Sequence, residues 1–237
     1  MSRLVTIRDA AGFVEEVGLA LLFPGPGLEV PSLYEAVAGV GAVPFVDGFN
    51  EPEALVWAWK DELPAAGLAW YGTFLYRRKS LLSPDLLSCL YAGAGSDDDH
   101  ESTDLCAAAH RIADALRPGP LTTAALREIV GNKSEYERGI GELNRALLVT
   151  SGGVEPQRSG WPAGVVELTC RAFTVGGGPD RRRATRHFLD ALTGATARDL
   201  SRAFGWPAAT ARAELDGLVA AGHAVFVDGV YRGLSPQ

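Results

Sequence analysis

The chain has 237 residues, of which 47% are hydrophobic, and a net charge of −7. This composition excludes a wholly disordered chain, and the length suits one large domain or two to three small ones. Its apolar stretches, such as Val17–Phe23, are far shorter than the roughly 18–20 residues that cross a bilayer. Early charges at Arg3, Arg8 and Asp9 rule out the apolar core of a secretory signal. We therefore expect a cytoplasmic protein without a membrane partner.

Charge is distributed unevenly along the chain. Residues 1–100 carry a net charge of −8, residues 101–170 of −2 and residues 171–237 of +3. A surface that faces nucleic-acid phosphates must be cationic, so we expect it near the C-terminal third.

The three cysteines predict neither a metal site nor a disulfide framework. Cys89, Cys106 and Cys170 lie among apolar neighbours, their number is odd, and no pair has the spacing of zinc ligands. We expect free thiols, and no metal or other cofactor.

The first hundred residues combine helical and extended patterns. Apolar spacing predicts a helix over Arg8–Leu22, which the Pro24–Gly27 segment then breaks. The small, acidic segment Gly93–Asp99 predicts a linker, so we assign residues 1–95 to an N-terminal region. Between them we expect helices over Ser32–Val40 and Glu53–Lys60, an extended segment over Ala42–Val46, an aromatic-rich segment over Trp70–Arg78 and a helix that begins at Ser83-Pro84.

The next segment predicts three helices followed by two strands. The helices are expected over Ser102–Leu116, Thr122–Val130 and Ser134–Leu147, and the extended segments over Leu148–Thr150 and Val165–Phe173. This order is typical of a winged helix, which we place at residues 101–175.

The same order recurs after a glycine-rich stretch, Gly176–Gly178. Thr122, Leu126 and Gly131 match Thr196, Leu200 and Gly205 at a constant offset of 74 residues. Helices are expected over Asp180–Leu192, Thr196–Phe204 and Pro207–Ala221, and a hairpin joins Ala224–Val227 to Val230–Arg232 across Asp228-Gly229. We predict a second winged helix at residues 179–237, and thus a mainly helical α+β fold with tandem winged-helix units.

Several motifs are spread over most of the chain from about Val40 onward. They are Trp59–Pro64, Tyr71–Phe74, Leu81–Pro84, Glu142-Leu143, Leu147–Thr150, Trp161-Pro162 and Leu168–Phe173. Together they resemble the tandem winged-helix superfamily of the AlkZ-type DNA glycosylases, and in particular its AlkZ-related branch. The resemblance implies three winged-helix units around a concave channel that faces DNA, with residues 1–95 as the third unit.

The resemblance also implies a catalytic motif that this chain lacks. Active members of the superfamily depend on two glutamines, or a glutamine and an aspartate, one residue apart after a short strand. We expect the corresponding segment at Gly41–Asp47, which contains no glutamine, and the chain has only Gln157 and Gln237. Asp47 is the one carboxylate there that could position water or stabilise an oxocarbenium ion, although its Val46–Asn50 context is also that of an ordinary turn.

Two basic runs are candidates for DNA contact. Arg77, Arg78 and Lys79 follow aromatic residues and suit a phosphate clamp beside stacking surfaces, or else the end of a helix. Arg181, Arg182, Arg183 and Arg186 lie at the start of a helix, where cations oppose the helix dipole, and this placement favours a functional use.

The helices that would read DNA bases carry carboxylates as well as cations. Ser134–Leu147 includes Glu135, Glu137 and Glu142, and Pro207–Ala221 includes Glu214 and Asp216. Carboxylates suit few base edges, so neither helix is typical of sequence-specific recognition, and protein contacts fit equally well. Trp57, Trp59, Trp161 and Trp206 have apolar or proline neighbours and are expected in the core.

Three functional hypotheses follow. In the first, an AlkZ-related protein without the glycosylase reaction binds double-stranded DNA through its backbone. In the second, a scaffold binds a protein partner and no DNA. In the third, an atypical DNA glycosylase uses Asp47.

Overall fold

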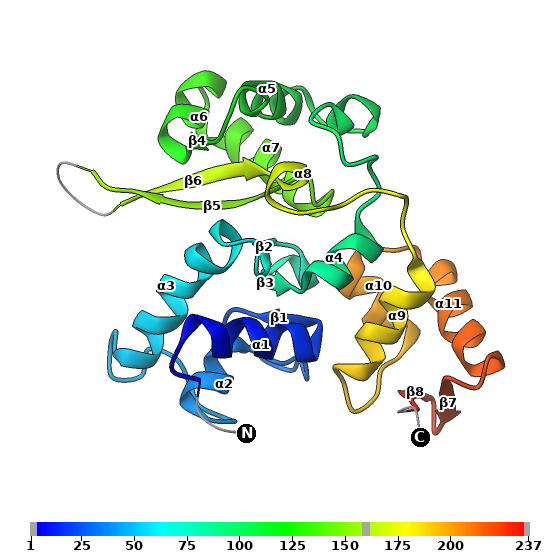
Figure 1. Cartoon of the computed structure of the whole chain (residues 1–237). Coiled ribbons are helices and arrows are strands. Elements are labelled where there is room, and N and C mark those ends of the chain that lie inside the picture. Colours follow the sequence, from blue (N-terminus) through cyan, green and yellow to red (C-terminus); the bar gives the residue numbers. More distant parts are fainter. Residues whose placement is uncertain (1–3, 158–161, 235–237) are drawn as a thin grey trace.

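A computed structural model describes residues 4–157 and 162–234 of the chain. The fold is mixed α and β and mainly helical, as expected from the sequence. Three successive segments, here called the N-terminal, middle and C-terminal units, each combine helices with a small antiparallel sheet. The middle unit lies above the other two, and both ends of the chain lie at the opposite edge of the molecule (Figure 1).

The N-terminal unit is built in the order helix, strand, two helices and two strands. Its elements are α1 (Ile7–Val17), β1 (Leu19–Leu21), α2 (Leu33–Ala38), α3 (Glu51–Ala65), β2 (Trp70–Thr73) and β3 (Lys79–Leu82), with the short 3-10 helix η1 (Leu75–Arg77) between β2 and β3. The sheet has the order β1-β3-β2, so the strand that comes last in the chain lies between the other two.

The middle unit repeats this order. Its elements are α5 (Ala107–Leu116), β4 (Leu121–Thr122), α6 (Thr123–Val130), α7 (Lys133–Arg145), β5 (Val149–Glu155), β6 (Ala163–Leu168) and the short helix α8 (Thr169–Ala172). The sheet order β4-β6-β5 is the same as in the N-terminal unit. The β5–β6 hairpin projects from the body of the molecule (Figure 1).

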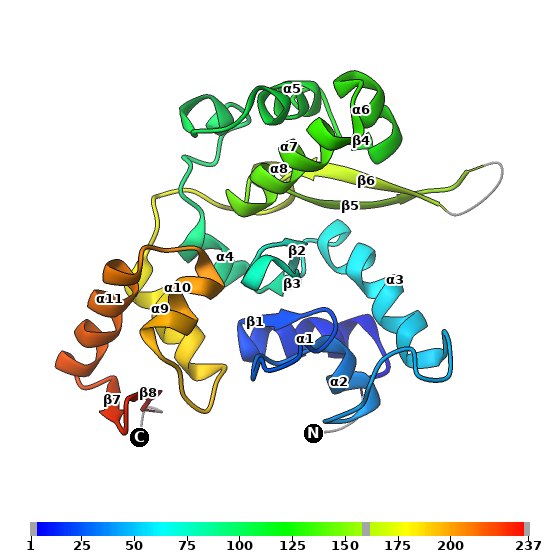
Figure 2. The same ribbon diagram turned by 180° about the vertical axis from the view of Figure 1, so that it is seen from behind.

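The C-terminal unit has the same plan with a reduced sheet. Its elements are α9 (Arg181–Asp190), α10 (Ala197–Phe204), α11 (Ala208–Ala220), β7 (Ala224–Val227) and β8 (Val230–Gly233). Ala195, between α9 and α10, makes a single antiparallel bridge to Tyr231 of β8 where the other units have their first strand. Helix α4 (Pro84–Leu90) joins the N-terminal and C-terminal units, as seen from behind in Figure 2.

Several of the expected boundaries were wrong. The helix expected over Glu53–Lys60 extends to Ala65, and the strand expected over Leu148–Thr150 extends to Glu155. The first helix ends at Val17 because Gly18 adopts φ 73°, and Leu19–Leu21 is a strand. Residues 42–46 are not a strand, because residues 44–47 form a turn with Phe45 at φ 63°. The helix expected from Ser102 begins at Ala107, after a 3-10 turn, η2 (Asp99–Ser102), and the strand expected to reach Phe173 ends at Leu168.

One hydrophobic core runs through all three units. It joins Trp70 and Leu82 of the N-terminal unit to Ile112 of the middle unit and Phe188 of the C-terminal unit. The indole of Trp70 is fully buried and donates a hydrogen bond to the carbonyl of Val149, at 3.1 Å. The units therefore pack as one body, because burial of this shared apolar surface is the main favourable term in their association.

The two connectors that enter and leave the middle unit touch backbone to backbone. A Cβ at Gly95 would lie 2.2 Å from the carbonyl oxygen of Val175, and a Cβ at Gly176 would lie 2.3 Å from that of Ala94. Both glycines have positive φ, at 88° and 117°. Only glycine fits both demands, since it lacks a Cβ and adopts positive φ at little cost.

The expected linker at Gly93–Asp99 is fixed by its last residue. Asp99 is only 6% exposed and accepts hydrogen bonds from the Tyr91 hydroxyl, at 2.7 Å, and from the backbone N–H groups of Ala94, Gly95 and Ser96, at 2.8–3.0 Å. These hydrogen bonds hold the pKa of Asp99 below its usual value against the opposing effect of burial.

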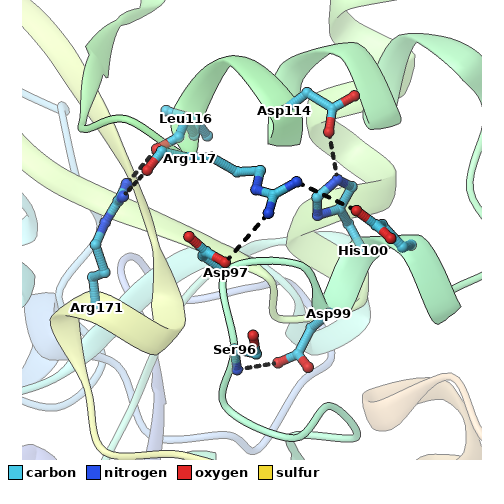
Figure 3. A network of polar contacts seen from close by, with 9 residues as sticks. Ser96, Asp97, Asp99, His100, Asp114, Leu116, Arg117 and Arg171 are labelled. Carbon is cyan, nitrogen blue, oxygen red and sulfur yellow. Dashed lines mark hydrogen bonds and ion pairs between the residues drawn. The ribbon is translucent and has the colours of Figure 1, made fainter.

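Polar contacts extend this anchor to the middle unit (Figure 3). The buried ring of His100 lies 2.8 Å from a carboxylate oxygen of Asp114 on α5. Arg171 of α8 donates to the carbonyl oxygens of Leu116 and Arg117, and so satisfies the free end of α5.

We predict that Asp99→Ala lowers the free energy of unfolding by about 2–4 kcal/mol, because one buried and three partly buried donors lose their acceptor. The measurement is guanidinium unfolding followed by tryptophan fluorescence. Asp98→Ala, at the exposed neighbouring position, is the matched control and should change stability by less than about 0.5 kcal/mol. Equal stability of the two variants would show that Asp99 does not anchor the connector.

Candidate nucleic-acid interface

The arginines at the start of α9 point to different neighbours. Arg183 is ion-paired with Asp85 of α4, and His187 lies 2.9 Å from the other oxygen of the same carboxylate. The Asp85 carboxylate raises the pKa of Arg183. Arg186 makes a weak pair with Asp190 one helical turn later, at 3.8 Å. Arg183 thus fastens α9 to α4 in addition to any role on the surface.

Arg181 and Arg182 have a different environment. The guanidinium carbon of Arg181 lies 6.0 Å from the ring centroid of Trp206, and Arg182 lies against Gly217 of α11. Both side chains are exposed, and the described residues place no carboxylate within 4.0 Å of either guanidinium. These two cations are available to a ligand.

The second basic run lies between β2 and β3, where Arg77 ends the short helix η1, Arg78 follows at its C-cap and Lys79 begins β3. Its three side chains diverge. Arg77 is exposed and faces α10, Arg78 packs beside Gly25, and Lys79 lies with its ammonium 5.5 Å from the ring centroid of Tyr71. The three side chains therefore lie in different surroundings.

Lys79 belongs to a second cationic cluster, on the side of the sheet that faces α3. Lys60 lies 4.9 Å from the ring of Trp57 and 5.9 Å from that of Tyr71, and pairs with Asp61 at 2.5 Å. Burial and the nearby Lys60 lower the pKa of Lys79. Trp57, expected in the core, is 44% exposed, whereas Trp59 is buried as expected and Trp161 lies outside the described residues.

A group that the sequence did not reveal forms where the β2–β3 turn meets α10. Tyr76 and Arg77 face Arg202 and Trp206 across a pocket of about 460 Å³. The guanidinium carbon of Arg202 lies 5.9 Å from the ring centroid of Tyr76. Trp206 was expected in the core but is half-buried at the edge of this pocket. The exposed face of α10, which places Arg202 one turn after Arg198, is the signal that could have indicated this surface.

The structure places Asp47 on an exposed turn between α2 and α3. The segment Gly41–Asp47 follows a helix, whereas the short strand that follows the first helix is β1. The segment after β1, Leu22–Pro26, likewise contains no glutamine. Either placement of the motif therefore leaves the glutamine pair missing.

Polar residues on α7 that were considered for base contacts are used inside the protein. Glu142 accepts a hydrogen bond from the backbone N–H of Cys106, at 2.7 Å, and pairs with Arg138 at 3.1 Å. Asn144 accepts one from the backbone N–H of Thr73, at 3.0 Å. On α11, Asp216 accepts a hydrogen bond from the Tyr231 hydroxyl, at 2.6 Å.

Neither a metal centre nor a membrane segment is found in the part of the chain that the structure describes. No group of three or more histidine, cysteine or acidic side chains there is arranged to hold an ion. No helix among these residues has the length and apolarity needed to span a bilayer. Cys89, Cys106 and Cys170 are free cysteines, as expected.

The fold and the site define a mixed α/β protein with exposed arginines gathered near aromatic side chains. A family model described as AlkZ related matches residues 4–196, which is most of the chain. The chain therefore belongs to the AlkZ-related family, as its motifs indicated. No curated protein and no solved structure gives a significant match.

We predict that Glu142→Gln destabilises the protein and flattens its response to acid. Hydrogen bonds from Cys106 and Arg138 lower the pKa of Glu142 to about 2 from an ordinary 4.5. Because the folded-state pKa is the lower one, the stabilisation is fully present well above pH 4.5 and is lost progressively as the pH falls through 4.5 toward 2.

The measurement is the free energy of unfolding at several pH values between about 7 and 3. At neutral pH the substitution should cost about 1–2 kcal/mol. Glu137→Gln, on the same helix but with a 59% exposed side chain, is the control and should preserve the acid response. An unchanged pH profile in Glu142→Gln would contradict the capping role of Glu142.

Proposed function

We propose that the protein binds double-stranded DNA through backbone contacts, on three winged-helix units, and does not carry out the glutamine-dependent excision of bases. The family supports a relationship to DNA glycosylases.

The repeated architecture supports the winged-helix part of the proposal. Helix, strand, helix, helix, strand and strand follow one another in the N-terminal and middle units, and in both sheets the last strand lies between the other two. The bridge from Ala195 to Tyr231 gives the C-terminal unit the same strand order in reduced form. Winged helices bind DNA in many proteins.

The observation that carries the proposal is a set of uncompensated arginines. Among the described residues, no carboxylate lies within 4.0 Å of the guanidinium groups of Arg77, Arg181, Arg182 or Arg202, while the chain as a whole is acidic. An acidic protein has many potential partners for its cations. Exposed arginines that remain unpaired on such a protein suit an anionic ligand with repeated charges, such as a phosphate backbone.

The composition of the chain supports the proposal that it does not excise bases as the active members of the superfamily do. Glutamine occurs only at Gln157, on an exposed segment beyond β5, and at Gln237, which lies outside the described residues. Asp47 is exposed on its turn, so it lacks the water-excluded surroundings that strengthen electrostatic catalysis.

An exposed apolar loop favours a second candidate function, the protein-binding scaffold. The loop between α2 and α3 exposes Val40, Val43, Phe45, Val46 and Phe49, with Val40 98% exposed. It is nevertheless ordered, because Glu53 accepts hydrogen bonds from the backbone N–H of Phe45 and from the Tyr34 hydroxyl. An ordered patch of this kind is typical of surfaces that bind other proteins.

We predict that Arg77→Ala and Arg181→Ala each weaken duplex binding by roughly 3- to 10-fold at low salt and reduce the salt slope by about 0.9. The measurement is fluorescence anisotropy with a labelled duplex at about 50 and 200 mM salt. Each substitution removes one exposed, unpaired cation, so folding should be unaffected.

Arg111→Ala is the matched control, because this arginine pairs with Glu135 at 2.7 Å. Its helix, α5, lies at the edge of the middle unit away from the other two units (Figure 1). It should retain the affinity and salt slope of the unaltered protein. If no duplex binds at about 50 mM salt, the DNA-binding proposal fails and the protein-binding scaffold becomes the better explanation.

A further inference from the structure

A pocket where the N-terminal and C-terminal units meet has the features of a site for a single nucleotide. It lies between the β2–β3 turn and the end of α10, has a volume of about 460 Å³, and is lined by Tyr76, Arg77, Ser201, Arg202, Gly205 and Trp206. This volume lies within the roughly 300–1,000 Å³ of pockets that hold small ligands. It is too small for a duplex, so a nucleotide would enter it only from an unpaired position.

The pocket combines aromatic faces with cations that have no carboxylate partner. Arg202 lies over the ring of Tyr76, at 5.9 Å, and Arg181 over that of Trp206, at 6.0 Å. Asp199 is the carboxylate whose negative charge raises the pKa of the Tyr76 hydroxyl, in addition to the effect of burial. This carboxylate already accepts hydrogen bonds from the backbone N–H and the hydroxyl of Thr196. Rings that stack and guanidinium groups that bind phosphate are what an unpaired nucleotide needs.

The aromatic platform is held rigidly from behind. Trp206 packs on Phe204 at 5.0 Å between ring centroids, Phe204 on Phe74 at 6.1 Å, and Phe74 on the buried Trp70 at 6.2 Å. The Ser201 hydroxyl also donates a hydrogen bond to the carbonyl oxygen of Trp206, at 2.7 Å. A ring fixed in this way offers a stacking surface at a low entropic cost.

The turn that faces α10 is strained. Tyr76 and Arg77 are adjacent non-glycine residues with φ of 51° and 59°, in the left-handed region that glycine normally occupies. Such conformations persist where the surrounding structure imposes them, and they cluster at ligand-binding sites. Here the strain projects one ring and one guanidinium toward the same pocket.

We propose that this pocket receives one unpaired nucleotide of a bound DNA strand. The base stacks against Trp206 and Tyr76, and the flanking phosphates contact Arg77 and Arg202. The inference rests on the proposed function, which supplies the duplex, and adds to it a preference for DNA that contains a base without a partner.

The test compares a fully paired duplex with the same duplex carrying one extra, unpaired 2-aminopurine. Anisotropy at about 100 mM salt should show roughly 5- to 20-fold tighter binding of the unpaired form. Stacking on the tryptophan should also quench the fluorescence of the 2-aminopurine. Trp206→Leu and Arg202→Gln should each abolish most of this preference. The affinity for the paired duplex should fall by less than about 3-fold in Trp206→Leu, and by the roughly 3- to 10-fold of one lost phosphate contact in Arg202→Gln.

Two further variants separate stacking from loss of structure. Trp206→Phe retains a ring and should recover part of the preference. Arg202 is exposed, so its substitution leaves the fold intact. Trp57→Leu removes an exposed tryptophan of α3 outside the pocket and should leave the preference unchanged.

Equal affinity of the unaltered protein for the two duplexes would overturn the pocket proposal and leave the proposed function standing. A preference that survives in both Trp206→Leu and Arg202→Gln would also overturn it. Failure to bind either duplex would overturn the pocket and the proposed function together.

Discussion

The architecture depends on the close contact between the two connectors of the middle unit. Gly95 and Gly176 bring two backbones so near that a side chain on either would collide with a carbonyl oxygen of the other connector. Asp99 holds one connector in place through its four hydrogen bonds, and the N–H of Asp180 fixes the other by donating to the carbonyl of Cys89. With the connectors fixed, the shared core can close across all three units.

This contact also sets the geometry of the cationic surface. Since α4 directly precedes the first connector and α9 directly follows the second, Asp85 reaches Arg183 and His187, and the C-terminal unit is fastened against the N-terminal unit. That attachment brings α10 to the β2–β3 turn, where Arg202 and Trp206 meet Tyr76 and Arg77. The pocket is therefore a product of how the units are joined and belongs to neither unit alone.

Local signals in the sequence predicted most helices well. Thr122 and Thr196 cap α6 and α10, and Gly131 and Gly205 end them in the left-handed region, so both helices lie where the 74-residue repeat placed them. The strand β1 was mistaken for helix because all of its residues are buried, and a strand covered on both faces shows no alternation. The turn at residues 44–47 depends on a hydrogen bond to Glu53, a partner that periodicity does not reveal.

For the candidate nucleic-acid interface, the sequence predicted several of the cations that take part but not how they are arranged. The sequence indicated which arginines are clustered along the chain, and it established that the glutamine pair is missing, because composition alone decides that question. It did not distinguish Arg183, which is committed to Asp85 across 98 residues, from Arg181, which is free of carboxylates. It also missed Arg202 and Tyr76 as neighbours, since only the packing of two units brings them together.

The meeting of the connectors has a consequence for the order of folding. Asp85 and Arg183 are 98 residues apart in the chain, and closing so long a loop carries an entropic cost. Once the middle unit has folded and joined Gly95 to Gly176, the effective separation of that pair falls to roughly seventeen residues. The folded middle unit thus shortens the loop that must close to bring Asp85 and Arg183 together. Its early formation would therefore speed the docking of the other two units.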